Sequence, residues 1–266
     1  MTKLIKNIRT EIQKLVRIKD DVDDRFKYLR LDKNECLISF DEQLLEQFKQ
    51  NITSQDLSAY PELDPLYSKL SKFLGIDEDQ ILLTAGSDIA IRSIFDACIE
   101  RNDNIILHDP CYAMYKVYGK MFGAEVRNIP FLDWQADLKK MLNYVDSNTK
   151  MMMVENPNGN LGTKPSFEQL EYYASELYKK NVLFLIDDTY FYLNNSRSKT
   201  HELISNYPNV LITQTFSKSH GLAGLRMGYL IGSTEIIEQI ARVRPLHEIT
   251  SLTARAAEWV LGNPGI

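Results

Sequence analysis

The sequence predicts an α/β fold in which helices cover both faces of a mostly parallel β-sheet. Short apolar runs alternate along the chain with longer segments of helical periodicity; the runs are ILLT, NIILHD, MMMVE, VLFLID and VLITQT. Turn-forming or polar residues follow most of these runs directly. Such alternation is typical of strands and helices that build a parallel sheet buried on both sides.

The elements can be assigned in chain order. Apolar residues recur at helical spacing in PELDPLYSKLSKFLG, which predicts a helix ending near Leu74, before Gly75. A short strand in QILLTAG precedes a second helix, SDIAIRSIFDACIER, which Ser87 and Asp88 can cap. The alternation then continues through strand NIILHD, helix PCYAMYKVYGKMFG, strand AEVRNIP, strand MMMVE, a helix over about 166–180, and strands VLFLID and VLITQT.

These elements predict one α/β domain from about residue 55 to 245. A polar N-terminal arm, residues 1–54, precedes it. In residues 246–266 a helical pattern places Leu252, Ala256 and Val260 on one side, which indicates a connecting helix.

Composition excludes several classes of protein. The 266 residues are 44% hydrophobic and carry a net charge of -5 with acidic and basic residues interleaved, so nucleic acid is not an expected partner. No segment approaches the ~20 apolar residues of a membrane span. Three cysteines without CxxC spacing argue against a disulfide framework and a metal site, and favour a cytoplasmic location.

Chemically active side chains follow the apolar runs, where ligands bind in open α/β sheets. After ILLT, Gly86 allows close backbone approach, and Ser87 with Asp88 starts a helix whose free N–H groups favour a phosphate. After MMMVE comes NPNGNLG, a stretch rich in turn formers. After VLFLI, Asp187 and Tyr190 bring a carboxylate and a phenol to the same edge of the sheet.

The stretch FSKSHGLAGLR, after VLITQT, adds Ser217, Lys218 and Arg226 to this edge. A buried lysine can lose its proton and form an imine with a carbonyl. Pyridoxal phosphate requires such a lysine, a carboxylate for its ring nitrogen, donors to its phenolic oxygen, and a helix N-terminus with Arg and Ser for its phosphate. The set of residues therefore predicts pyridoxal 5'-phosphate as the cofactor.

These motifs support a family resemblance. The chain resembles the fold-type I, class I/II aminotransferases, and within them the histidinol-phosphate aminotransferase branch. The matching stretches span residues 31 to 232 in the family's order; they are LDKNE, SAYPELD, TAGSDIAI, DPCYAMY, NPNGNLG, IDDTY and TFSKSHGLAGLRMGY. The last is the most specific, because a serine precedes the lysine and an arginine follows it eight residues later.

The resemblance implies a role for each catalytic residue. Lys218 would bind the cofactor aldehyde as a Schiff base and later shuttle the proton of the substrate's α-carbon. Asp187 would pair with the pyridine nitrogen. Asn158 and Tyr190 would bond the ring's 3' oxygen, and Tyr112 would stack on the ring face.

The resemblance also implies the remaining contacts. Ser87, Ser217 and Arg226 would hold the phosphate together with the backbone of Gly86 and Asp88. Tyr60 resembles the tyrosine that reaches the partner's phosphate and so implies a homodimer. Asn34 resembles an asparagine near the substrate carboxylate.

The chain departs from the family pattern in two places. The usual N-P-T-G is replaced by Asn160-Leu161-Gly162 after Asn158-Gly159, which leaves Asn156 as the alternative to Asn158. Family members also continue for on the order of 100 residues, which form a small domain with the arginine that clamps the substrate carboxylate. The resemblance therefore implies that residues 1–54 begin this small domain and that it is incomplete here.

The expected activity is transfer of an amino group between a small amino donor, an amino acid or a histidinol-phosphate-like amino-alcohol phosphate, and a 2-oxo acid such as 2-oxoglutarate. Two alternatives share the cofactor. One is decarboxylation of a phosphorylated amino acid, because the bond that breaks depends on substrate contacts outside the cofactor site. The other is a truncated paralogue that binds the cofactor without turnover.

Overall fold

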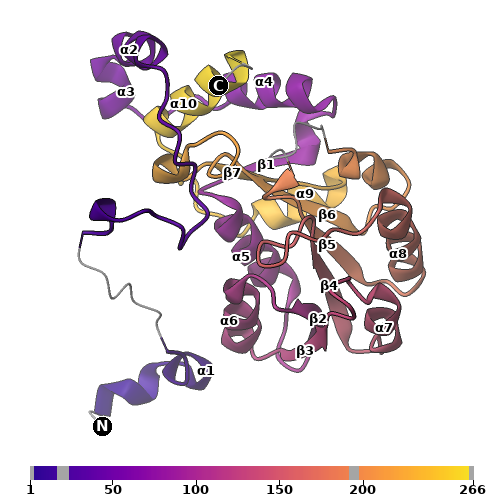
Figure 1. Ribbon diagram of the computed structural model, residues 1–266. Helices are drawn as coiled ribbons and strands as arrows, with labels where there is room; N and C mark the ends of the chain where they lie inside the picture. The colour runs from indigo at the N-terminus through magenta and orange to yellow at the C-terminus, as the bar shows by residue number, and fades with distance from the viewer. Residues whose placement is uncertain (1–2, 17–23, 192–197, 264–266) are drawn as a thin grey trace.

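The computed structural model describes residues 3–16, 24–191 and 198–263. Its centre is a seven-stranded sheet with the order β1-β7-β6-β5-β4-β2-β3, flanked by helices on both faces (Figure 1). β7 runs antiparallel to both neighbours, and the other neighbouring pairs are parallel. The strands are β1 (Ile81–Thr84), β2 (Asn104–Asp109), β3 (Glu125–Pro130), β4 (Thr149–Glu155), β5 (Leu183–Asp187), β6 (Val210–Thr215) and β7 (Gly228–Ile231).

The predicted α/β class with a mostly parallel sheet is confirmed. The predicted strands and helices occur in the expected order, and β7, inside the stretch that follows Lys218, is an additional strand. The α-helices are α1 (Thr10–Gln13), α2 (Glu42–Gln50), α3 (Ser54–Ser58), α4 (Asp64–Leu74), α5 (Ser87–Cys98), α6 (Ala113–Phe122), α7 (Leu138–Asn143), α8 (Phe167–Lys179), α9 (Thr234–Ala241) and α10 (Ser251–Gly262). The short 3-10 helices are η1 (Lys3–Asn7), η2 (Arg25–Lys27), η3 (Glu78–Gln80), η5 (Thr200–Ser205) and η6 (Ala223–Leu225).

Two apolar clusters lie on the two faces of the sheet. α5, α6 and α9 cover one face, where Ile94 and Tyr118 pack with Leu211. α4, α7, α8 and α10 cover the other face, where Leu70 and Leu177 belong to the second cluster. Because successive strand residues point to opposite faces, strands buried on both sides consist of nearly continuous apolar runs.

Within the predicted segment 246–266, residues Ser251–Gly262 form the helix α10, and residues 264–266 lie outside the described part of the chain. Ala256 and Val260 are buried in the same apolar cluster as α4, while Leu252 is only partly buried. α10 therefore packs against α4 in the helix layer on this face of the sheet. The division of the chain into residues 1–54, 55–245 and 246–266 stays a prediction.

The topology brings the ends of several strands to one edge. Glu155 of β4 pairs with Asp187 of β5, which pairs with Thr213 of β6. The turns after these strands therefore emerge side by side. In the residues that the structure describes, no helix has the length and apolar character needed to cross a membrane.

Candidate active site

A cavity of about 520 Å³ lies at this edge of the sheet and is called the main cavity below. The strand-end turns and the arm segment 32–35 line it. Its volume suits a small molecule or cofactor. It brings together most of the predicted site residues, namely Asn34, Ser87, Asp88, Tyr112, Asp187, Tyr190, Ser217, Lys218 and Arg226.

Lys218 lies just after β6, with its amino group facing the arm. Its Nζ donates a hydrogen bond to the Lys33 carbonyl at 2.6 Å and lies 5.5 Å from the centre of the Tyr190 ring. Burial lowers the pKa of Lys218 below its ordinary value, and the Arg226 cation acts in the same direction. A lowered pKa increases the share of neutral amine, which is the nucleophilic form.

Asp187 ends β5 and is 7% exposed. Its Oδ1 accepts the Thr189 backbone N–H at 3.0 Å, and its Oδ2 accepts the Tyr115 hydroxyl in a short bond. These donors orient the carboxylate at the wall of the main cavity. A buried carboxylate in this position favours a cationic ligand group beside it.

An anion cradle forms where α5 begins. Gly86 precedes α5 with φ 89°, and a Cβ placed on it would lie 2.6 Å from Nη2 of Arg226. Nη1 of Arg226 donates to the Ser217 hydroxyl at 3.2 Å. The guanidinium therefore lies against the start of the helix, whose first N–H groups lack intrahelical partners and favour an anion.

Aromatic and amide groups form the other walls. Tyr112 is 41% exposed, and its ring meets Tyr115 edge-on at 5.6 Å. The Tyr190 hydroxyl accepts a hydrogen bond from the Asn34 amide at 3.1 Å, which links β5's turn to the N-terminal arm. Both tyrosines are therefore placed to contact a flat ligand in the main cavity.

The structure does not bring Asn158 to the main cavity. This residue is 4% exposed; its amide donates to the Pro110 carbonyl at 3.1 Å, and its oxygen accepts the N–H groups of Asn160 and Leu161 at 3.0 and 2.9 Å. Asn158 is therefore bonded within its own turn and to the Pro110 carbonyl, and its contact with the cofactor ring stays a prediction.

The alternative, Asn156, is also directed elsewhere. It is 2% exposed, and its amide donates to Asp188 at 2.9 Å. From the same loop, Gly159 and Asn160 line the main cavity instead. A Cβ on Gly159 would lie 2.6 Å from the Tyr190 ring, so the loop passes close to that phenol.

Tyr60 lies outside the main cavity as well. It is 73% exposed and stacks on His247, with 4.0 Å between the ring centres. An exposed aromatic ring of this kind can meet a second chain, so the predicted contact across a dimer stays a prediction.

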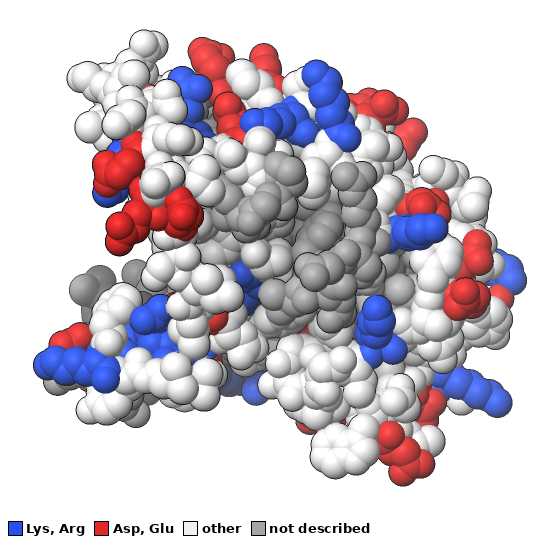
Figure 2. Space-filling view, turned by 45° about the horizontal axis from the view of Figure 1, so that its top comes forward, with Lys and Arg blue, Asp and Glu red and all other residues white. Residues whose placement is uncertain are grey.

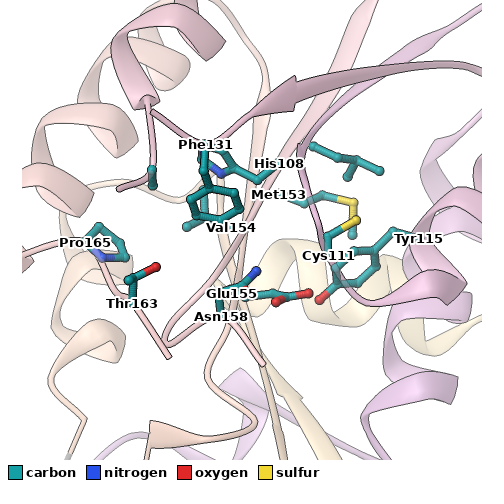
Figure 3. A pocket seen from close by; sticks show the side chains of 12 residues that line it. His108, Cys111, Tyr115, Phe131, Met153, Val154, Glu155, Asn158, Thr163 and Pro165 are labelled. Atoms are coloured by element: carbon teal, nitrogen blue, oxygen red, sulfur yellow. The ribbon is translucent and has the colours of Figure 1, made fainter. Parts of the chain in front are cut away.

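Sequence reasoning missed Glu155, the last residue of β4. It lines the main cavity and also a second cavity of about 10 Å³, which is shown in Figure 3. Burial and the neighbouring Asp187 carboxylate raise the pKa of Glu155 to about 7. Its signal in the sequence was its position: it ends MMMVE as Asp187 ends VLFLID.

Comparisons with known proteins identify the family and the fold. The family "Aminotransferase class I and II" matches residues 27–265, which is most of the chain. The chain belongs to the class I and II aminotransferases. The resemblance predicted from its motifs is therefore confirmed at the level of the family.

Individual relatives come from one branch of this family. The chain is 34% identical to a histidinol-phosphate aminotransferase of Geobacillus sp. (strain WCH70) over 72% of its own length and 53% of the relative. It is 34% identical to that of Christiangramia forsetii over 80% of its length and 61% of the relative. The chain thus spans between half and two thirds of the length of these curated relatives.

Solved structures share the fold. A histidinol-phosphate aminotransferase from Sinorhizobium meliloti, solved in complex with pyridoxal-5'-phosphate, superposes with a TM-score of 0.80 at 21% identity, over 88% of this chain and 64% of the other. An L-threonine-O-3-phosphate decarboxylase from Porphyromonas gingivalis gives 0.72 at 22% identity, over 84% of this chain and 69% of the other. At these identities the match shows the aminotransferase fold.

Proposed function

We propose that this protein is a pyridoxal-phosphate-dependent aminotransferase. The observation that carries the proposal is the meeting of three features in one cavity: Lys218, Asp187, and the cradle residues Ser87, Ser217 and Arg226. The family membership and the relatives named above support it.

The residues fit the cofactor at each end. The phosphate would lie in the cradle, where Gly86 leaves space that any Cβ would fill and where Ser217 and Arg226 add donors. The ring nitrogen would meet Asp187, and the aldehyde would be held by Lys218. When bound, pyridoxal phosphate supplies an aldehyde for amino groups and a ring that accepts the electron pair of the substrate's α-carbon.

The protein's own side chains have distinct roles in this scheme. The Asp187 carboxylate, which Tyr115 and Thr189 fix in place, would stabilise a positive charge on the ring nitrogen. Nζ of Lys218 would take up the proton of the substrate's α-carbon. Tyr112 would cover the ring and exclude water.

The proposed substrates are an amino acid or a histidinol-phosphate-like amino-alcohol phosphate as donor and a 2-oxo acid such as 2-oxoglutarate as acceptor. The branch to which the relatives belong supports this choice. We also propose a homodimer in which Tyr60 meets the partner's cofactor, residues 55–245 as the cofactor-binding unit, and a cytoplasmic location in keeping with three free cysteines.

The proposal is tested by spectroscopy with the purified chain. Pyridoxal phosphate should give a visible absorbance band with the wild type and none with Lys218→Ala. Histidinol phosphate should then bleach the wild-type band, and 2-oxoglutarate should restore it. A band of equal strength in Lys218→Ala would refute the role of the lysine.

The same assay separates the alternatives. Release of carbon dioxide from a phosphorylated amino acid, without formation of a 2-oxo acid, would show the decarboxylase. A stable visible band that no amino donor changes would show a chain that binds the cofactor without turnover.

A further inference from the structure

We infer that Glu155 is a positioning residue that holds two walls of the main cavity together in its charged form and makes cofactor binding pH-dependent. The inference rests on the proposed function, because the ligand whose binding it controls is pyridoxal phosphate.

The contacts of the carboxylate carry the first step. Oε1 of Glu155 accepts the backbone N–H of Tyr112 in a short bond, and Oε2 accepts the backbone N–H of Gly159 at 3.0 Å. Tyr112 precedes α6, and Gly159 belongs to the turn after β4. One side chain therefore ties together two loops that line the cavity from different parts of the chain.

The two hydrogen bonds of Glu155 fix the positions of two aromatic walls of the main cavity. Tyr112 is the proposed cover of the cofactor ring, and Gly159 lies against the ring of Tyr190. If either N–H lost its acceptor, a backbone donor beside the cavity would lack a partner, which costs about as much as a lost hydrogen bond. Glu155 thus positions both aromatic walls without touching the reacting atoms.

The surroundings explain why the charge state matters. Glu155 and Asp187 lie side by side on β4 and β5. The charge of Glu155 also acts on the other titratable groups near it, which are Tyr115, Tyr190 and Cys111. Two effects oppose the ionisation of Glu155 and so raise its pKa: burial is the larger, and the negative charge of Asp187 is the second. Figure 3 shows the Glu155 carboxylate and the Tyr115 hydroxyl near each other, beside Asn158.

The direction of the pH effect follows from the contacts. Only the ionised carboxylate offers two pure acceptors to two N–H donors, since protonation converts one oxygen into a donor. A positive ring nitrogen beside Asp187 would also favour ionised Glu155. Cofactor binding should therefore lower the pKa of Glu155, and affinity should rise with pH until the pH exceeds the pKa of about 7 in the free protein.

The test compares Kd for pyridoxal phosphate in the wild type and Glu155→Gln from pH 6 to 8.5, with Glu238→Gln as a control on the exposed surface of α9. The amide keeps the shape but turns a donor toward one N–H. We expect binding roughly tenfold weaker than the wild type at pH 8 and a ratio that shrinks toward pH 6. Other ionisations, including that of Lys218, are common to both proteins and cancel in the ratio.

A constant ratio across this range, or equal affinities, would overturn the inference while leaving the proposed function intact. Failure of the wild type to bind at any pH would refute both. If Glu155→Gln does not fold, calorimetry in two buffers of different ionisation enthalpy counts the protons released when pyridoxal phosphate binds. Near pH 7 the wild type should release more protons than Glu155→Asp. Equal release by the two proteins would refute the inference.

Discussion

Gly86→Ala is expected to damage the anion cradle selectively. Gly86 has φ 89° and ψ 161°, a region that is nearly exclusive to glycine and costs other residues about 1–3 kcal/mol. The new Cβ would also lie 2.6 Å from Nη2 of Arg226, so the guanidinium must move away from the start of α5. Loss of a charged hydrogen bond to the phosphate costs about 1.5–3 kcal/mol, or roughly 10- to 150-fold in Kd.

The assay is a pyridoxal phosphate titration by absorbance, combined with a thermal melt. Gly75→Ala is the matched control: Gly75 follows α4 as its C-cap with φ 76°, but apart from its chain neighbours no atom lies within 4 Å of the point that its new Cβ would occupy. Both variants should melt earlier than the wild type, and only Gly86→Ala should bind more weakly. Equal affinity of Gly86→Ala and the wild type would refute the placement of the phosphate.

Two further variants test Asp187 and His108. Asp187→Asn should still bind the cofactor through the cradle but turn over about 100-fold or more slowly, measured as kcat; an unchanged kcat would contradict its role. Burial lowers the pKa of His108 to about 4, so the unfolded state takes up a proton first and stability should fall as pH drops from about 6.5 toward 4. In urea unfolding, the unfolding free energy of His108→Gln should fall less steeply than that of the wild type as the pH drops. The same dependence on pH in both proteins would contradict this assignment.

Much of the site follows from the sequence because parallel strands end at one edge. Asp187 ends the run VLFLID, whereas Lys218 and Arg226 both follow the run VLITQT, and the topology brings the three residues to one cavity. The fold class could be predicted for the same reason, since runs buried on both faces are nearly continuous. The short strand β7 was harder to predict because it closely follows the turn that carries Arg226.

The loop 156–162 shows what the sequence leaves open. Asparagine is equally suited to bond a ligand and to accept N–H groups of its own turn, and Asn158 does the latter. The sequence does not predict which of these bonds Asn158 makes, because its amide partner, the Pro110 carbonyl, is brought to it only by the fold. The importance of Glu155 likewise depends on its partners, Tyr112 and Gly159, which only the folded chain brings together.

The charge on the surface indicates less about function than the charged groups in the main cavity do. On the face drawn in Figure 2, Lys and Arg side chains lie among Asp and Glu side chains. The distinctive electrostatic feature is internal, where Lys218 and Arg226 share a cavity with Asp187 and Glu155.

The central claim is that pyridoxal phosphate is bound through Lys218. The most direct test is borohydride reduction of the protein with pyridoxal phosphate, followed by digestion and mass spectrometry of the peptides. We predict a single modified lysine in the peptide that contains TFSKSHGLAGLR, at Lys218. An unlabelled peptide, or labelling spread over surface lysines while Lys218 stays free, would contradict the claim.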